Sequence, residues 1–315
     1  MLPQVAAVLG PTAAGKTALA VALRKAGLPV EVVCCDGPQM VRGVDAATAK
    51  PTAAERAAVP HHLVDVWPLD EALSAGRYVT LATAAIAEIH GRGGWPLLVG
   101  GTGLYHRALC RGLAPIPEVP ATLRAALAAE AEARGLQALW QELARVDPDY
   151  AAGTPANNRQ RVLRALEVWR HTGRSFSAWH AQPTTPHVRS FDIVLQPPRQ
   201  AWEERLARRA YAMVEPLLVE AASLRDAGVA ATAPGLAALG YRDAYAVLAA
   251  AGGEVADVAA AERGALADVL LRSHRRYAKR QRTFFASLAP ALVLDPAAAD
   301  CVDVAAAALR RLFAA

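Results

Sequence analysis

The sequence has few cysteines and no long apolar run. Its four cysteines, Cys34, Cys35, Cys110 and Cys301, show no CxxC spacing, so we expect neither a disulfide framework nor a zinc site. No apolar run approaches the roughly 18 residues of a membrane span. The first residues also lack the basic and apolar segments of a signal peptide. These absences predict a reduced, cytoplasmic enzyme with no membrane partner.

Lysine and aromatic residues are scarce as well. The 34 basic residues include only 4 lysines, and aromatic residues make up 6% of the chain. Because a compact ammonium group and a guanidinium group are not interchangeable, the remaining lysines are candidates for specific roles. Lys16, Lys50 and Lys279 lie in motifs described below, whereas Lys25 is expected on a solvated helix.

The sequence does contain the pattern of a phosphate-binding loop. The segment Gly10–Thr17 reads GPTAAGKT and follows the apolar run Val5–Leu9, which is the strand, loop and helix order of a P-loop. Loop amides and the helix dipole favour an anion, Lys16 adds a charge, and the Thr17 hydroxyl suits Mg²⁺. The alternative is a glycine turn beside an ordinary lysine. The predicted contacts to a di- or triphosphate are Gly10, Thr12, Ala13, Ala14, Gly15, Lys16 and Thr17.

The first hundred residues alternate between short apolar runs and helical patterns. This alternation is typical of a parallel sheet whose ligand lies at the carboxyl ends of the strands. The predicted strands are Val5–Leu9, Val30–Cys35, His62–Val66 and Pro96–Gly100, and the predicted helices are Lys16–Ala26 and Tyr78–Gly91.

The pattern changes after residue 113. Residues 121–180 are almost entirely helical in character, Phe191–Leu195 again resembles a strand, and the remainder is mostly helical. We therefore predict an α/β fold with a P-loop NTPase-like parallel sheet flanked by helices and an inserted all-helical domain. The expected divisions are 1–117 for the first part of the core, 118–189 for the insertion and 190–315 for the rest of the core.

Notable polar groups lie at the ends of three predicted strands: the P-loop, Asp36 and Thr102. Asp36 can orient Mg²⁺ or act as a general base, and the alternative is an N-cap or turn aspartate. Thr102 follows a double-glycine turn and would place a hydroxyl at the site, unless it is only part of that turn. No acidic residue ends the strand before Thr102, so Asp65 is the better candidate for a Walker B carboxylate. The pair His61-His62 is expected to be structural, because adjacent strand side chains point to opposite faces.

Two runs are rich in basic residues, Asn157–Arg164 and Arg272–Arg282. Residues three and four apart share a helix face, so positions 272, 275, 276 and 279 form one cationic stripe. Such stripes contact phosphate backbones, and the interleaved Tyr277 and Gln281 can reach sugars or bases. The alternative is a solvated helix face.

These features occur together in a known family. The chain resembles the tRNA dimethylallyltransferases, also called tRNA isopentenyltransferases, over nearly its whole length. The matching segments, in the order of that family, are Gly10–Thr17, Asp36–Gly43, Thr48–Thr52, Val59–Asp65, Val99–Tyr105, Gln160–Arg161, Arg164–Val168, Leu239–Arg242 and Arg276–Gln281.

The resemblance implies transfer of a dimethylallyl group from dimethylallyl diphosphate to the exocyclic amine of the tRNA adenosine immediately 3′ of the anticodon. Asp36 would act as the general base. The P-loop, Lys16, Thr102 and Mg²⁺ held at Thr17 would stabilise the leaving diphosphate. Mg²⁺ is therefore the expected cofactor, and we expect a monomer.

The resemblance also implies contacts with the tRNA anticodon stem-loop, because the adenine must leave the loop stack to react. The expected tRNA contacts are Asp36, Gly37, Pro38, Gln39, Thr102, Arg124, Gln160, Arg161, Val162, Leu163, Arg164, Gly240, Tyr241, Arg242, Arg276, Lys279 and Arg280. Arg205 and Arg209 match an arginine pair of the family, and we expect Arg209 at the diphosphate.

The sequence departs from the family at several positions. Gly37 stands where serine is usual, Val41 where tyrosine is usual, and Asn158, His274 and Phe284 replace a common Asp, Thr and Trp. The base, the P-loop and the leaving-group contacts are intact, so we predict an active enzyme.

Three other functions remain open at this point. A P-loop kinase acting on a small molecule would consume ATP and ignore tRNA. An isopentenyltransferase acting on free adenine nucleotide would not need the arginine runs. A non-catalytic RNA-binding protein would not need Asp36.

Overall fold

The computed structural model describes residues 2–238 and 240–314. The chain forms two compact units, one of Met1–Cys110 with Pro186–Ala315 and the other of Arg111–Thr185. We call the first the α/β unit and the second the helical unit. The predicted division of the chain at 117/118 and 189/190 lies a few residues from these boundaries and stays a prediction.

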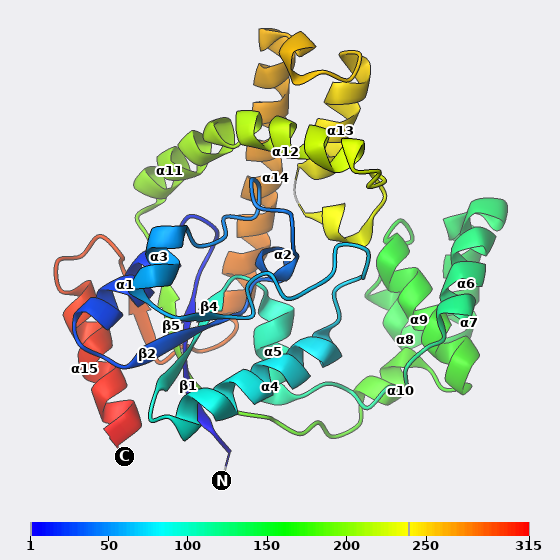
Figure 1. Cartoon of the computed structure of the whole chain (residues 1–315). Helices are drawn as coiled ribbons and strands as arrows, with labels where there is room; N and C mark the ends of the chain where they lie inside the picture. The colour runs from blue at the N-terminus through cyan, green and yellow to red at the C-terminus, as the bar shows by residue number, and fades with distance from the viewer. Residues whose placement is uncertain (1, 239, 315) are drawn as a thin grey trace. The chain divides into compact units, whose positions relative to one another are not determined.

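A parallel sheet of six strands forms the core of the α/β unit (Figure 1). Its strand order is β3-β2-β4-β1-β5-β6. In β1 the residues from Val5 to Leu9 are fully buried, as expected for a strand covered on both faces. The predicted α/β fold with a parallel sheet is confirmed. The strands are β1 (Gln4–Leu9), β2 (Val30–Cys34), β3 (His61–His62), β4 (Trp95–Gly100), β5 (Arg189–Leu195) and β6 (Leu292–Leu294).

Helices cover both faces of this sheet. Ala6 and Val8 of β1 pack in one cluster with α1 and α15, whereas Val5, Ala7 and Leu9 join the cluster of α4, α5 and α12–α14. This is the alternation that a strand requires. The helices are α1 (Lys16–Lys25), α2 (Gly37–Met40), α3 (Ala53–Ala58), α4 (Ala75–Gly91), α5 (Gly103–Arg111), α11 (Arg199–Ala212), α12 (Val214–Asp226), α13 (Tyr241–Ala250), α14 (Ala260–Ala286) and α15 (Cys301–Ala314).

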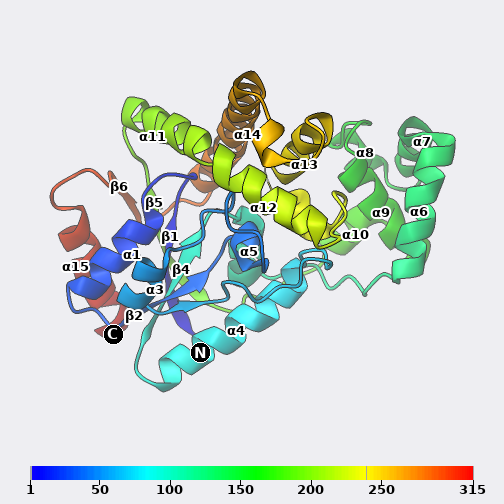
Figure 2. The same cartoon turned by 45° about the horizontal axis from the view of Figure 1, so that its top comes forward.

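The long helix α14 packs against α11 (Figure 2). Its buried residues include Leu266, Leu270, Ala278 and Phe285. The basic residues of Arg272–Arg282 are exposed. One helix therefore contributes both to the core of the α/β unit and to a cationic surface.

The helical unit has its own core. Leu127, Leu139, Leu143, Val162 and Leu166 are all fully buried, and they fix the apolar faces of three helices against one another. The helices are α6 (Ala121–Arg134), α7 (Leu136–Val146), α8 (Pro148–Ala152), α9 (Arg159–Thr172) and α10 (Phe176–His180).

The structure differs from the predicted strands at β3 and β6, and the helices α2, α3 and α5 were not predicted either. The predicted strand His62–Val66 is wrong, because β3 ends at His62 and Leu63 and Asp65 adopt left-handed φ angles of 66° and 58°, which a strand does not accommodate. The strand β6 was not predicted. It has three residues, too few for a recognisable periodic pattern.

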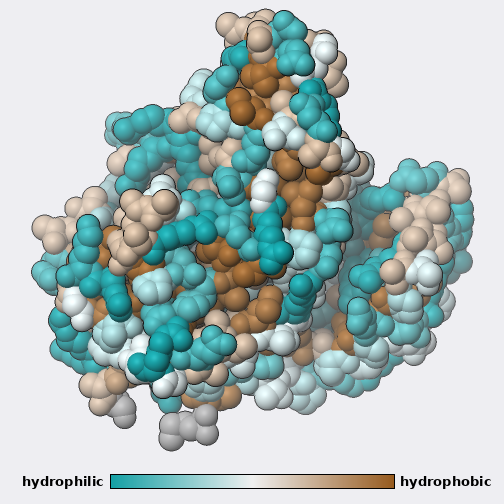
Figure 3. Space-filling view, in the orientation of Figure 1, coloured by the Kyte–Doolittle hydropathy of each residue, from teal (hydrophilic) through white to brown (hydrophobic). Residues whose placement is uncertain are grey.

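The surface shows no long apolar element. No helix within residues 2–238 and 240–314 is long and apolar enough to cross a bilayer. The face drawn in Figure 3 is hydrophilic over much of its area, and apolar side chains reach it in separate areas. Exposed apolar side chains such as Leu104, Tyr211 and Val219 belong to three different helices.

Candidate active site

The P-loop joins β1 to α1 through unusual backbone conformations. A Cβ at Gly10 would lie 3.0 Å from the carbonyl oxygen of Leu195 on β5. Ala13 and Gly15 adopt left-handed φ angles of 62° and 89°. The helix α1 begins at Lys16, and no side chain caps its first turn. The amides of that turn are therefore available to an anion.

The Lys16 side chain turns back over the P-loop. Its Nζ donates to the carbonyl oxygens of Gly10 and Pro11, both at 3.0 Å. Burial lowers the pKa of Lys16 to about 8; the charge of Asp36 opposes this shift and that of Arg209 reinforces it. Lys16 is thus a desolvated cation that a phosphate group would stabilise.

Asp36 lies two residues beyond the end of β2, and its side chain does not cap α2. The backbone N–H of Gly101 donates to its carboxylate. Burial raises the pKa of Asp36, while the charges of Lys16 and Arg209 act in the opposite direction. The structure therefore brings Lys16, Asp36 and Arg209 into mutual electrostatic interaction from three distant segments, and the expected contact of Arg209 with the diphosphate stays a prediction.

Thr102 is held against the loop that follows β2. Its N–H donates to the carbonyl oxygen of Cys35 at 3.0 Å, and its Oγ1 accepts a hydrogen bond from the N–H of Gly37, also at 3.0 Å. Its side chain is also hydrogen-bonded to Tyr277. This close approach requires glycine at position 100, where a Cβ would lie 2.1 Å from the Cys35 carbonyl oxygen. The Thr102 hydroxyl is therefore fixed beside Asp36.

The surroundings of Gly37 include one close side chain. A Cβ at this position would lie 2.9 Å from Cδ1 of Leu73 and 3.5 Å from the hydroxyl of Tyr105. Leu73 is 40% exposed, so the end of its side chain has room to move away from a small side chain such as the serine that the resemblance leads us to expect. The Gly37 N–H keeps its bond to Thr102.

The inner face of α14 meets both the P-loop and the turn before Thr102. Gln281 is 4% exposed, its Oε1 accepts a hydrogen bond from the N–H of Thr12 at 2.9 Å, and its Nε2 donates to the carbonyl oxygen of Gly101 at 2.9 Å. The prediction that Gln281 reaches sugars or bases is wrong, because its amide is used inside the protein. Helical spacing from the exposed Lys279 could have placed Gln281 on another face, but could not have identified its partners.

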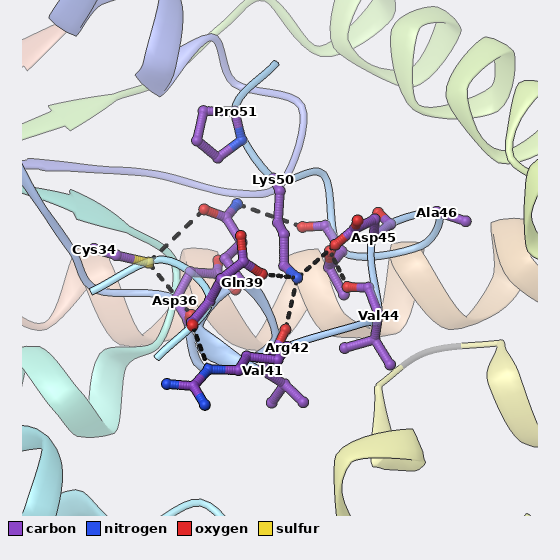
Figure 4. A network of polar contacts seen from close by, with 12 residues as sticks. Cys34, Asp36, Gln39, Val41, Arg42, Val44, Asp45, Ala46, Lys50 and Pro51 are labelled. Atoms are coloured by element: carbon purple, nitrogen blue, oxygen red, sulfur yellow. Dashed lines mark hydrogen bonds and ion pairs between the residues drawn. The ribbon is translucent and has the colours of Figure 1, made fainter. Parts of the chain in front are cut away.

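A network around Lys50 fixes the loop that follows α2 (Figure 4). The Lys50 Nζ donates to the carbonyl oxygen of Val41 at 2.6 Å and pairs with the carboxylates of Asp45, at 2.5 Å, and Asp65. The Gln39 side chain donates to the backbone of the same loop. The Walker B prediction for Asp65 is wrong, because β3 ends three residues before it, Asp65 itself has a left-handed φ, and Lys50 engages its carboxylate.

Mg²⁺ would find few protein ligands here. Within residues 2–238 and 240–314, no group of three or more His, Cys, Asp or Glu side chains could hold a metal ion. The Thr17 hydroxyl, in the first turn of α1, has no hydrogen-bond partner in the described part of the chain. This donor set fits a Mg²⁺ held mainly by phosphate oxygens and water, with one protein hydroxyl.

Most of the residues predicted to contact tRNA have accessible side chains. Those of Val162 and Tyr241 do not: both are fully buried, and the Tyr241 hydroxyl donates to Glu220 at 2.5 Å, so contact through these two side chains is contradicted. Leu239, in the matched segment Leu239–Arg242, lies outside the described residues. The exposed side chains are Arg124, Gln160, Arg161, Arg242, Arg276, Lys279 and Arg280, and the half-buried ones are Pro38, Gln39, Leu163 and Arg164.

Comparison with known proteins gives a consistent picture. The family model of IPP transferase matches residues 39–288. The tRNA dimethylallyltransferase of Methylibium petroleiphilum is 46% identical over 283 residues, which cover 87% of this chain and 84% of that protein. That of Thiobacillus denitrificans is 41% identical over 97% of this chain and 96% of its own length.

A solved structure agrees over the full chain. The tRNA isopentenylpyrophosphate transferase of Bacillus halodurans superposes with a TM-score of 0.67 at 33% identity, covering 100% of this chain and 97% of that one. Sequence and fold thus point to the same group of proteins, and the chain belongs to the IPP transferase family.

Proposed function

We propose that the protein transfers a dimethylallyl group from dimethylallyl diphosphate to N6 of the tRNA adenosine immediately 3′ of the anticodon. A bond forms between the amine nitrogen and C1 of the dimethylallyl group, the bond from C1 to the diphosphate oxygen breaks, and the amine loses a proton. The observation that carries this proposal is that Asp36 lies in the electrostatic field of Lys16 and Arg209 beside the P-loop. The proposed base, Asp36, therefore lies beside the proposed anion site, the P-loop, as this reaction requires.

Asp36 is proposed as the general base. The exocyclic amine of adenine is a poor nucleophile, so its proton must be taken as the bond to carbon forms. Burial makes Asp36 a stronger base than a solvated carboxylate, while Lys16 and Arg209 favour its ionised form. The hydrogen bond from Gly101 orients the carboxylate.

The P-loop is proposed to hold the leaving diphosphate. Its amides, the Lys16 ammonium and the Thr102 hydroxyl would stabilise the charge that develops as the carbon–oxygen bond breaks. Arg209, whose pKa burial lowers, would gain a counterion there. Thr17 would hold Mg²⁺, which supplies further charge neutralisation when bound.

The exposed basic side chains are proposed to bind the anticodon stem-loop. Phosphate contacts would come from Arg124, Gln160, Arg161 and Arg164 of the helical unit, and from Arg242, Arg276, Lys279 and Arg280 of the α/β unit. The flipped adenosine would meet Asp36, Gly37, Pro38, Gln39 and Thr102, since base chemistry requires the base to leave the stack. We expect a cytoplasmic monomer.

A direct assay tests the proposal. The protein is incubated with Mg²⁺, dimethylallyl diphosphate and an unmodified tRNA that carries adenosine beside its anticodon. The tRNA is then digested, and its nucleosides are identified by mass spectrometry. We expect isopentenyladenosine. Its absence would overturn the proposal, consumption of ATP with a small acceptor would favour a kinase, and efficient modification of free adenine nucleotide would favour an isopentenyltransferase that does not need tRNA.

Replacement of the base gives the sharpest single prediction. Asp36→Asn keeps the shape of the side chain but not its basicity, so the single-turnover rate should fall by about 10²- to 10⁴-fold while tRNA still binds. Asp70→Asn, at an exposed aspartate, is the matched control. An unchanged rate in Asp36→Asn would remove Asp36 from the chemistry.

A further inference from the structure

Three side chains of α14 each meet one residue of the turn 101–103. The Gln281 Nε2 donates to the carbonyl oxygen of Gly101 at 2.9 Å. Tyr277 is hydrogen-bonded to the side chain of Thr102. The ring of Phe284 lies beside Gly103, where an added Cβ would be 2.4 Å from the ring. The inner face of α14 is therefore docked along the whole turn that carries Thr102.

Gln281 is the one of these three that also reaches the P-loop. Its Oε1 accepts a hydrogen bond from the N–H of Thr12 at 2.9 Å. The carbonyl oxygen of the same Thr12 accepts a hydrogen bond from Nε1 of Trp202 on α11, also at 2.9 Å. Both backbone polar groups of Thr12 are thus engaged by helices, so its amide is not free for the diphosphate, and the predicted contact of Thr12 with that group would have to come from its hydroxyl.

We propose that Gln281 is a positioning residue that sets the P-loop against the Thr102 turn and ties both to α14. The proposal rests on the proposed function, because it concerns the geometry of the same site. A glutamine amide donates at one atom and accepts at the other, which matches a carbonyl oxygen on one side and an N–H on the other. Asparagine is too short to span them, and glutamate lacks the donor.

The position of Gln281 on α14 links two functions. The exposed face of the same helix carries Arg276, Lys279 and Arg280, the proposed contacts to RNA. Because Gln281 is buried and holds both loops, a movement of α14 on binding RNA would move the diphosphate loop and Thr102 together. Loss of its amide would leave a partly buried N–H and a buried carbonyl group without partners, which is costly.

Two substitutions and a control test the proposal. Gln281→Met removes both hydrogen bonds at similar volume, and Thr283→Ala changes an exposed residue of the same helix. For Gln281→Met we expect kcat/KM for dimethylallyl diphosphate to fall by about tenfold or more, with the Kd for tRNA changed less than about twofold. Thr283→Ala should match the wild type in both.

Gln281→Glu adds a second measurement, the pH dependence of the rate, which should not change if Gln281 only stabilised the fold. The new side chain still accepts from Thr12 but sets a carboxylate oxygen against the Gly101 carbonyl oxygen. Protonation restores the donor, so its rate relative to wild type should rise by about threefold or more as the pH is lowered from about 8 to about 6. Gln281→Met should show no such rise.

The outcomes separate this proposal from the proposed function. If wild type makes no isopentenyladenosine, the proposed function fails whatever the variants do. If wild type is active and Gln281→Met folds and retains full kcat/KM, the positioning role is overturned. If Gln281→Met does not fold, Gln281→Glu decides: a pH profile parallel to that of the wild type overturns the proposal.

Discussion

The basic residues of α9 and α14 look alike in the sequence and differ in the structure. In α9 most arginines are paired with glutamates. In α14, Arg276, Lys279 and Arg280 are exposed and form no ion pair with any carboxylate of residues 2–238 and 240–314. The α9 pairs are Arg159–Glu132, Arg164–Glu167, Arg170–Glu130 and Arg170–Glu142.

The difference has a clear origin in the neighbouring helices. α6 and α7 present Glu130 and Glu142 to Arg170, whose guanidinium bonds both carboxylates at 2.5 and 2.7 Å. These bonds lower the pKa of Glu130 to about 2. Most arginines of one cationic run are thus paired with glutamates by the fold, whereas Arg276, Lys279 and Arg280 of the other are left unpaired within the described residues.

The largest effect should follow from reversing the free charges of α14. In the variant Arg276→Glu/Lys279→Glu/Arg280→Glu, three phosphate contacts are replaced by repulsion, so the Kd for tRNA should rise by about 100-fold or more and its salt dependence should weaken. Filter binding at several salt concentrations measures both. Arg310→Glu/Arg311→Glu/Lys25→Glu, at exposed positions of α15 and α1, makes the same change in net charge, and equal losses in the two variants would show that net charge rather than the surface of α14 sets the affinity.

Removal of the paired arginine of α9 should instead affect folding. Arg170→Met removes the guanidinium that bonds both Glu130 and Glu142 and leaves these partly buried carboxylates only the half-exposed Arg134, so the free energy of unfolding should fall by about 1 to 2 kcal/mol, with little change in tRNA affinity. Arg159→Met is the control, because the side chain of its partner Glu132 is 77% exposed and such pairs stabilise by less than about 1 kcal/mol. Chemical denaturation measures both, and a tRNA defect without loss of stability would contradict the assignment of Arg170.

A third effect, about tenfold for each pH unit, concerns pH. Lys16 is a cation without a carboxylate bonded to it, and its pKa of about 8 means that its charge is present below about pH 8 and lost above it. In the free enzyme, kcat/KM for dimethylallyl diphosphate should therefore decline by about tenfold per pH unit above that value. The ion pairs of α9 persist there, so far-ultraviolet circular dichroism should stay constant. A flat profile up to about pH 10 would show that Lys16 is not required as a cation.

Local sequence predicted the parts of the site that local backbone conformation determines. Gly10–Thr17 encodes the loop and the start of α1, and the end of each parallel strand placed Asp36 and Thr102. Gln281 could not be assigned, because its partner Thr12 lies 269 positions away. Asp65 was misassigned for a related reason: its carboxylate is bound by Lys50, which reaches it only once the loop has folded.

The two lysines with enclosed ammonium groups have a practical consequence. Lys16 and Lys50 point their nitrogen atoms at backbone carbonyl oxygens, where a planar guanidinium would not fit, which suggests why a chain so rich in arginine retains lysine there. The exposed lysine side chains are Lys25 and Lys279. An amine-reactive probe on the folded protein would thus label the side chains of Lys279 on α14 and Lys25 on α1. Bound RNA should shield Lys279, while Lys25 serves as an internal reference.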